Sequence, residues 1–242
     1  MNIQQLLARR SDLGTFLVHL TREYPDGTPA KDNLKSIIED RCIEARNPYG
    51  SATSRLSELH AETEENLNSQ RVVCFTETPL EHVRLLTEQI EYRKFQFGPY
   101  GIAITKRSAR LWDVNPVWYL DITPGHNWLT TPLDKLIDTE IKKQTFATSH
   151  IAKLTPFIEQ MGRGINLDTR IDYFKEYWWE REWRHAGNFY LNTKFIVICP
   201  EEYYSKIEDI LSPKMPFIDP SWSLEQIIGR LAGFKSEDID PF

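Results

Sequence analysis

The segment from Tyr177 to His185, YWWEREWRH, places two carboxylates and an arginine at alternating positions. On a β-strand, residues two apart share a face, so Glu180, Glu182 and Arg184 would point the same way. Two close carboxylates raise the pKa of one of them unless Arg184 or a ligand hydroxyl compensates. Such a pair can orient a ribose and stabilise positive charge at a sugar carbon. The alternatives are an ion-pair ladder on an exposed face, or a helix in which Glu180 and Arg184 pair at i,i+4.

A second candidate group lies near the N-terminus, in the segment FLVHLTR at residues 16–22. His19, inside an apolar strand, needs hydrogen-bond partners and is either a donor to a ligand hydroxyl or a satisfied core residue. Thr21 would share the strand face of His19 and offer its hydroxyl to the same space. Arg22 follows at the strand end, where its guanidinium suits bidentate phosphate binding. A solvated surface arginine is the simpler alternative.

Two further segments place aromatic or charged groups beside predicted strand ends. Tyr100 precedes Gly101 and offers a stacking surface, with core packing as the alternative. Lys106 closes the next strand and could meet a phosphate. Glu77 follows the strand at 71–75, where it either charges the next helix or belongs to a binding loop. The sequence leaves both roles of Glu77 open.

The sequence favours no metal site. Four histidines lack Cys or His partners at ligand spacing: His60, His82, His126 and His150. Three cysteines lie far apart without C-x-x-C spacing, and we expect them to be reduced core residues: Cys42, Cys74 and Cys199. The phosphate-loop, dinucleotide, nucleophile-elbow and zinc-protease motifs are also missing from the sequence.

The elements that must position these residues follow from local patterns. Short β-branched or bulky segments predict strands at 16–21, at 71–75, at 101–105, after Pro116 and at 195–199. Apolar spacing and capping signals predict helices over 33–45, over 79–92 with Thr78 as N-cap, within 132–161, over 201–211 and from Ser223. Residues 46–70 are polar and lack a sustained period, which predicts a loop with room for one helical piece.

Strands flanked by helices without strict alternation predict the α+β class, with a mixed or antiparallel sheet. A chain of 242 residues can bury the core of a single domain, and we expect one over residues 1–242. Within it we expect a helical insertion at about 130–165 and C-terminal helices between 201 and 235.

Charge and hydropathy narrow the range of partners. The formal net charge is −6 and Lys and Arg form no long block, which argues against a basic surface for non-specific nucleic-acid binding. The longest apolar runs, FLVHL and FIVIC, are too short to span a bilayer. The N-terminus lacks the features of a signal peptide. We therefore expect a cytoplasmic protein without a membrane partner.

Four segments in this order resemble the AbiGi family of abortive phage-resistance proteins. They are FLVHLT with NLKSIIEDRCIEA, then VVCFTETPLEHV, then YGIAITKRSARLWDVNPVWYL, and finally EREWRH, spanning about Phe16 to His185. The resemblance implies the antitoxin-like half of a two-gene phage-defence module. Its partner would be a nucleotidyltransferase-type toxin.

The same motif order is similar, at lower specificity, to the ADP-ribosyltransferase fold, particularly the DarT-like group. That resemblance implies that NAD is the substrate and that a protein or nucleic acid is the acceptor. It assigns His19 to the NAD ribose, Tyr100 to the nicotinamide, and Glu182 to catalysis, with Glu180 two residues before it. Arg22 or Lys106 would contact the pyrophosphate, and Glu180 or Arg184 would orient the acceptor.

Three hypotheses therefore stand side by side. The transferase hypothesis predicts that His19 and Glu182 converge on one cleft. The antitoxin hypothesis predicts a broad surface that binds and restrains a partner toxin, with both residues serving packing. A purely structural hypothesis assigns them to core contacts and ion pairs.

Overall fold

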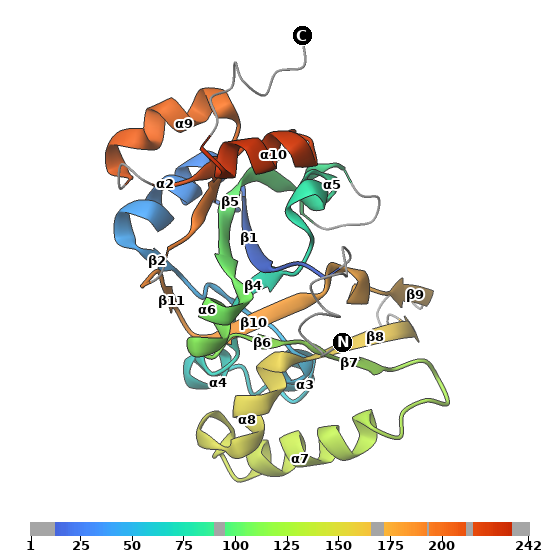
Figure 1. Ribbon diagram of the computed structural model, residues 1–242. Coiled ribbons are helices and arrows are strands. Elements are labelled where there is room, and N and C mark those ends of the chain that lie inside the picture. Colours follow the sequence, from blue (N-terminus) through green and yellow to red (C-terminus); the bar gives the residue numbers. More distant parts are fainter. Residues whose placement is uncertain (1–12, 90–94, 166–171, 193, 212–214, 234–242) are drawn as a thin grey trace. The chain divides into compact units, whose positions relative to one another are not determined.

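The computed structural model describes residues 13–89, 95–165, 172–192, 194–211 and 215–233 (Figure 1). The chain divides into two compact units. Unit 1 comprises residues 1–42, 75–112 and 190–242, and unit 2 comprises 43–74 and 113–189. Both units combine helices and strands, so the α+β mixture expected from the sequence is confirmed. The single domain over 1–242 stays a prediction.

A mixed sheet forms the centre of unit 1. Its strands are ordered β13 (Phe217–Ile218), β12 (Ile196–Ile198), β5 (Phe97–Thr105) and β1 (Phe16–Arg22), followed by the end of β4 (Arg71–Thr76). The pairs β12–β5, β5–β1 and β1–β4 are antiparallel, whereas β12 and β13 run parallel. The predicted strands at 16–21 and 195–199 are confirmed, and the one at 101–105 extends back to Phe97.

Helices surround this sheet in unit 1: α2 (Ala30–Asp40), η1 (Leu80–His82), α5 (Val83–Thr87), α6 (Lys106–Leu111), α9 (Glu201–Ile207), η5 (Glu208–Ile210) and α10 (Leu224–Leu231). One core cluster joins Val18 and Leu20 of β1 to Leu86 of α5 and Ile227 of α10. Alternation along β1 therefore places Val18 and Leu20 on the face that packs against these helices.

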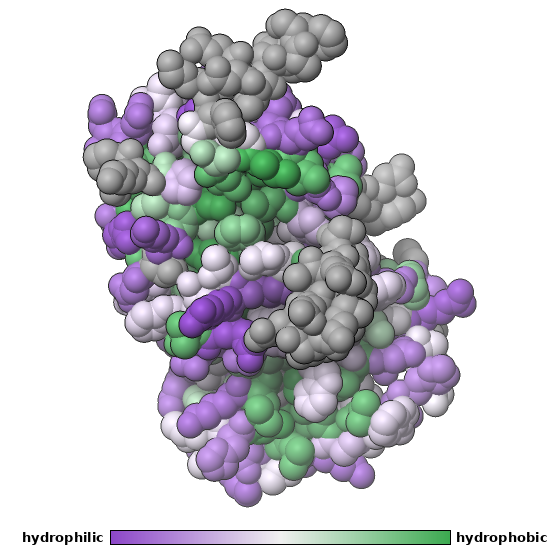
Figure 2. Space-filling view, viewed as in Figure 1, coloured by the Kyte–Doolittle hydropathy of each residue, from purple (hydrophilic) through white to green (hydrophobic). Residues whose placement is uncertain are grey.

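Helix α10 begins at the capping box that the sequence indicates. The Ser223 hydroxyl accepts from the Gln226 amide, and the Gln226 side chain accepts from the Ser223 amide. Apolar surface gathers over α10 in the hydropathy view (Figure 2), where three residues are exposed: Leu224, Ile228 and Leu231. The prediction of C-terminal helices within 201–235 is confirmed for α9 and α10, although β13 separates them. Residues 212–214 and 234–235 lie outside the described part of the chain.

The described strands of unit 2 lie mostly in two groups. In one, β10 (Glu182–Ala186) lies between β4 and β6 (Asn115–Pro116), and β3 (Asn47–Pro48) pairs with the other edge of β4. In the other, β8 (Ile158–Ile165) lies between β7 (Trp118–Asp121), which is parallel to it, and β9 (Asp172–Lys175), which is antiparallel. A two-stranded sheet pairs β2 (Cys42–Ile43) with β11 (Phe189–Tyr190).

The helices of unit 2 are α3 (Ser51–Glu58), α4 (Glu64–Asn68), α7 (Thr130–Lys142), η2 (Phe146–Thr148), α8 (His150–Leu154), η3 (Thr155–Phe157) and η4 (Trp178–Glu180). Its core packs Leu56 of α3 against Ile137 of α7 and against Leu120 and Ile158 of the second sheet. The loop with room for one helical piece expected at 46–70 is thus corrected to the short strand β3 and two helices. Burial of Ala52 and Leu56 stabilises α3 although its sequence is polar.

The helical insertion expected at about 130–165 is wrong for its last eight residues. Helical structure ends at Phe157, and residues 158–165 form β8. Ile158 to Met161 pair with Trp118 to Asp121, and Gly162 and Gly164 disfavour a helix. Long-range strand pairing therefore outweighs the local apolar spacing.

The helix expected over 79–92 is also shorter, since η1 and α5 end at Thr87 and residues 90–92 lie outside the described chain. Thr78 does not cap it, because its hydroxyl lies 2.8 Å from the Thr76 hydroxyl and Pro79 occupies the cap position. Among the described helices, none has the length and apolar character to cross a membrane.

Candidate functional site

Glu182 and Arg184 lie side by side on β10, as strand alternation requires. Arg184 Nε donates to Glu182 Oε1 at 2.8 Å, and Nη2 donates to Oε2 at 2.9 Å. Both oxygens of the Glu182 carboxylate therefore accept hydrogen bonds from one guanidinium. This bidentate geometry is the strong form of the ion pair.

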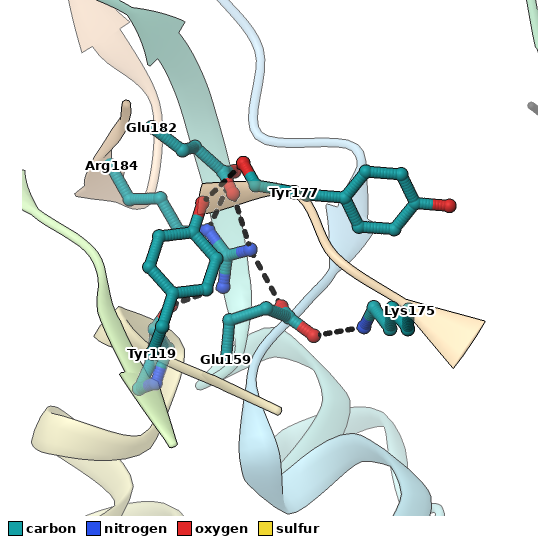
Figure 3. A network of polar contacts seen from close by, with 7 residues as sticks. Tyr119, Glu159, Lys175, Tyr177, Glu182 and Arg184 are labelled. Carbon is teal, nitrogen blue, oxygen red and sulfur yellow. Dashed lines mark hydrogen bonds and ion pairs between the residues drawn. The ribbon is translucent and has the colours of Figure 1, made fainter. Parts of the chain in front are cut away.

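Arg184 is 2% exposed and makes further contacts within unit 2 (Figure 3). Nη1 donates to the Pro156 carbonyl at 2.7 Å, and Nη2 also donates to Glu159 Oε2 at 2.7 Å. The guanidinium carbon lies 5.4 Å from the ring centroid of Tyr49. Burial opposes the charge, but Glu182 and Glu159 outweigh it and raise the pKa of Arg184.

Glu159 of β8 connects Arg184 to Lys175 of β9, whose ammonium donates to Glu159 Oε1. Burial raises the pKa of this carboxyl, but the charges and hydrogen bonds of Arg184 and Lys175 outweigh it. They hold the pKa of Glu159 below its ordinary value. We call Glu159, Lys175, Glu182 and Arg184 the ionic cluster. Its two carboxylates balance its two cations.

Two neighbouring groups are held neutral beside the ionic cluster. Burial, reinforced by the charge of Glu182, raises the pKa of the Cys74 thiol well above its ordinary value. The same two causes raise the pKa of Tyr119, whose hydroxyl donates to the Tyr177 carbonyl at 3.3 Å. Neither group is therefore poised as a nucleophile or base near neutral pH.

Glu180 lies outside β10, so the strand alternation that predicted a face shared with Glu182 and Arg184 does not reach it, and its role in a site stays a prediction. It ends η4, and Arg181 then adopts a left-handed conformation with φ of 47° before the strand begins at Glu182. The turn breaks the alternation on which the prediction rested. The alternative i,i+4 pairing of Glu180 with Arg184 is wrong too, because residues 182–186 are extended.

Spacing in the sequence did not indicate Glu159 or Lys175. Both come from strands that follow η3, and Glu159 lies in the segment expected to be helical. The one local signal against that helix is the pair of glycines at Gly162 and Gly164, which does not point to Glu159 itself.

In unit 1, the predicted ligand residues of β1 are bound to neighbouring groups. His19 is half-buried, and its ring packs edge-on against Phe75 with centroids 5.9 Å apart. The Thr21 hydroxyl lies 2.7 Å from the Ala30 carbonyl and 3.2 Å from that of Tyr100. The Arg22 guanidinium lies over the Phe95 ring at 4.0 Å.

The remaining two predicted residues of unit 1 also have protein partners. Tyr100 packs against Tyr203 with ring centroids 5.1 Å apart, and burial raises its pKa. Lys106 starts α6, where its ammonium donates to Glu77 at 2.7 Å. Glu77 is therefore the buried partner of Lys106, a role the sequence left open.

The structure thus brings Glu182 and Arg184 together in unit 2, and places His19, Thr21, Arg22, Tyr100 and Lys106 in unit 1. A cleft shared by His19 and Glu182 stays a prediction. Across the described chain, no group of three or more His, Cys, Asp or Glu side chains could hold a metal ion. NAD binding stays a prediction as well.

The chain is a mixed α/β protein in which a charge-balanced ionic cluster, largely buried, occupies the most conspicuous candidate site. A family model described as "Putative abortive phage resistance protein AbiGi, antitoxin" matches residues 35–215, which are 181 of the 242 residues. The protein belongs to the AbiGi family. The match includes Tyr100, Lys106, Glu182 and Arg184, and begins after β1.

No curated protein and no solved structure matches the chain. The ADP-ribosyltransferase-like fold therefore stays a prediction.

Proposed function

We propose that this protein is the antitoxin of an abortive-infection system and that it restrains a partner toxin by binding it. The observation that carries the proposal is the AbiGi match over 181 residues. We further propose that the interaction takes place in the cytoplasm, where a phage-defence antitoxin would meet its toxin.

The geometry of Glu182 argues against its use as a catalytic carboxylate. A carboxylate that stabilises an oxocarbenium-like state must face the reacting sugar. Both oxygens of Glu182 instead accept from Arg184, which is itself buried. Freeing Glu182 would break two hydrogen bonds to a buried guanidinium, which would then keep Glu159 and the Pro156 carbonyl as acceptors.

The competing hypothesis is an NAD-dependent ADP-ribosyltransferase that uses His19 and Glu182. It requires nicotinamide release and a modified protein or nucleic-acid acceptor. It also requires the Glu182–Arg184 pair to open in the presence of NAD.

A co-expression experiment tests the antitoxin proposal. The chain is expressed with its partner toxin, and growth is compared with expression of the toxin alone. We expect growth to be restored by wild type. Toxicity that persists while the chain accumulates in soluble form would overturn the proposal.

A second arm of the experiment separates binding from chemistry. Purified wild type and Glu182→Gln are incubated with NAD and candidate acceptors, with Glu62→Gln, an exposed glutamate of the same unit, as the matched control. We expect no nicotinamide release from any of the three. Release by wild type and Glu62→Gln that is lost in Glu182→Gln would establish the transferase instead.

A further inference from the structure

Exposed aromatic side chains gather where β9 ends in unit 2. Phe174 is exposed on β9, and Tyr177, Trp178 and Trp179 follow in the turn through η4. Trp178 is 54% exposed and Trp179 is 43% exposed. We call Phe174, Tyr177, Trp178 and Trp179 the aromatic turn. Large aromatic side chains at the surface are enriched at protein interfaces and are costly to leave in water.

Hydrogen bonds hold the aromatic turn in one conformation. Trp178 Nε1 donates to the Glu176 carboxylate at 2.5 Å, and Trp179 Nε1 donates to the Glu176 carbonyl at 3.0 Å. The polar edges of both indoles are thus satisfied within the protein. The exposed parts of the rings are their apolar carbon surfaces.

The base of the turn is fixed to the ionic cluster. Lys175, which precedes the turn, donates to Glu159, and the Tyr177 carbonyl accepts from Tyr119 (Figure 3). A partner that contacts these tryptophans therefore loses little side-chain entropy on binding. Such preorganisation is what distinguishes interface anchors from mobile surface residues.

The charge around the aromatic turn indicates the chemistry of its partner. Residues 172–181 carry three carboxylates, Asp172, Glu176 and Glu180, and two cations, Lys175 and Arg181. Lys175 is paired with Glu159. Negative charge beside exposed indoles favours a guanidinium or ammonium group, which can contact a ring face and a carboxylate together. The whole chain has a formal net charge of −6, which favours association with a basic protein.

We propose that the aromatic turn is the docking surface for the partner toxin and receives Arg or Lys side chains of that protein. This inference rests on the proposed antitoxin function and specifies the surface that performs it. Trp178 and Trp179 are its anchors, and Glu176 is the residue that positions them.

Binding of purified partner toxin to the purified full chain tests the surface by titration calorimetry. We expect Trp178→Ala and Trp179→Ala each to weaken binding about 30-fold or more, as interface tryptophans do. The matched control is Trp128→Ala, which removes a 75% exposed tryptophan of the same unit outside the turn. It should bind as wild type does.

The outcomes distinguish a failure of the proposed docking surface from a failure of the proposed antitoxin function. If wild type binds the toxin and both turn variants bind equally well, the surface is wrong and the antitoxin function stands. If wild type does not bind, the antitoxin function itself fails. Circular dichroism of each variant shows that a weakened one is folded, and Glu176→Gln, which keeps the side-chain oxygen, should weaken binding less than Trp178→Ala.

Other occupants of the surface give different results. A single-stranded RNA oligonucleotide that quenches tryptophan fluorescence of wild type but not of Trp178→Ala would overturn the proposal in favour of nucleic acid. Self-association in sedimentation, lost in the same variant, would overturn it in favour of a second copy of this chain.

Discussion

At the residue scale, Arg184 is the most deeply buried charged side chain among the described residues. It satisfies two carboxylates and a backbone carbonyl from a position with almost no exposure to water. Its pairing with Glu182 could be predicted from alternation in EREWR, because residues two apart on a strand are neighbours. Glu159 and Lys175 could not, because only the long-range pairing of β7, β8 and β9 brings Glu159 to Arg184 and Lys175 to Glu159.

Replacing Arg184 with methionine tests how much its ion pairs contribute to stability. Methionine keeps much of the side-chain volume but leaves Glu159 and Glu182 buried without their shared cation. We expect the free energy of unfolding to fall by about 3–5 kcal/mol. Urea denaturation measures it, with Arg46→Met as control. Arg46 pairs with Glu44 on the surface, so Arg46→Met should lower the free energy of unfolding by less than about 1 kcal/mol. Equal effects of the two substitutions would contradict the account.

Glu159 gives the stability of the protein a pH dependence of known sign. Its pKa is lower in the folded state than the ordinary value of 4.5 because Arg184 and Lys175 favour the carboxylate. Its contribution is therefore complete above the unfolded pKa and is lost as pH falls through the folded pKa. The groups that face it are Arg184, Lys175 and Glu182.

We expect Glu159→Gln to lose less stability than wild type between pH 5 and pH 3, roughly the window below the unfolded pKa. Denaturant midpoints across this range measure the difference. Parallel pH profiles for the two proteins would show that Glu159 is not held ionised by the ionic cluster.

At the element scale, helices and strands with strong local signals were predictable. Strands that form only by pairing with segments distant in the sequence were not. The strand at 16–22 and the capping box at Ser223 follow from local pattern. β8 was mistaken for a helix because its pairing with β7 and β9 outweighs local spacing. The strand in EREWRH starts only at Glu182 because Arg181 adopts a left-handed conformation. No local signal in the sequence predicts that conformation.

The close pairing of β1 with β5 depends on Gly101. A Cβ at this position would lie 2.2 Å from the His19 carbonyl oxygen, which belongs to the backbone and cannot move aside. We expect Gly101→Ala to destabilise the protein by about 3 kcal/mol. Thermal and urea unfolding measure it against Ala103→Gly on the same strand, whose effect should be smaller. A Gly101→Ala protein as stable as wild type would contradict the observed register.

At the scale of the whole molecule, the chain passes between the two units four times, at 42/43, 74/75, 112/113 and 189/190. Local sequence patterns do not indicate such passages, because each unit is assembled from segments distant in the chain. The mixture of helices and strands was predictable, and so was AbiGi membership from the order of four motifs. The proposed antitoxin role depends on a surface that binds the toxin and not on a single reactive group.

The affinity of purified wild-type chain for purified partner toxin, measured by titration calorimetry without NAD, tests that role most directly. We predict a saturable complex of defined stoichiometry that forms without any covalent change in either protein. No detectable binding, together with nicotinamide release when NAD is added, would contradict the account and favour the transferase.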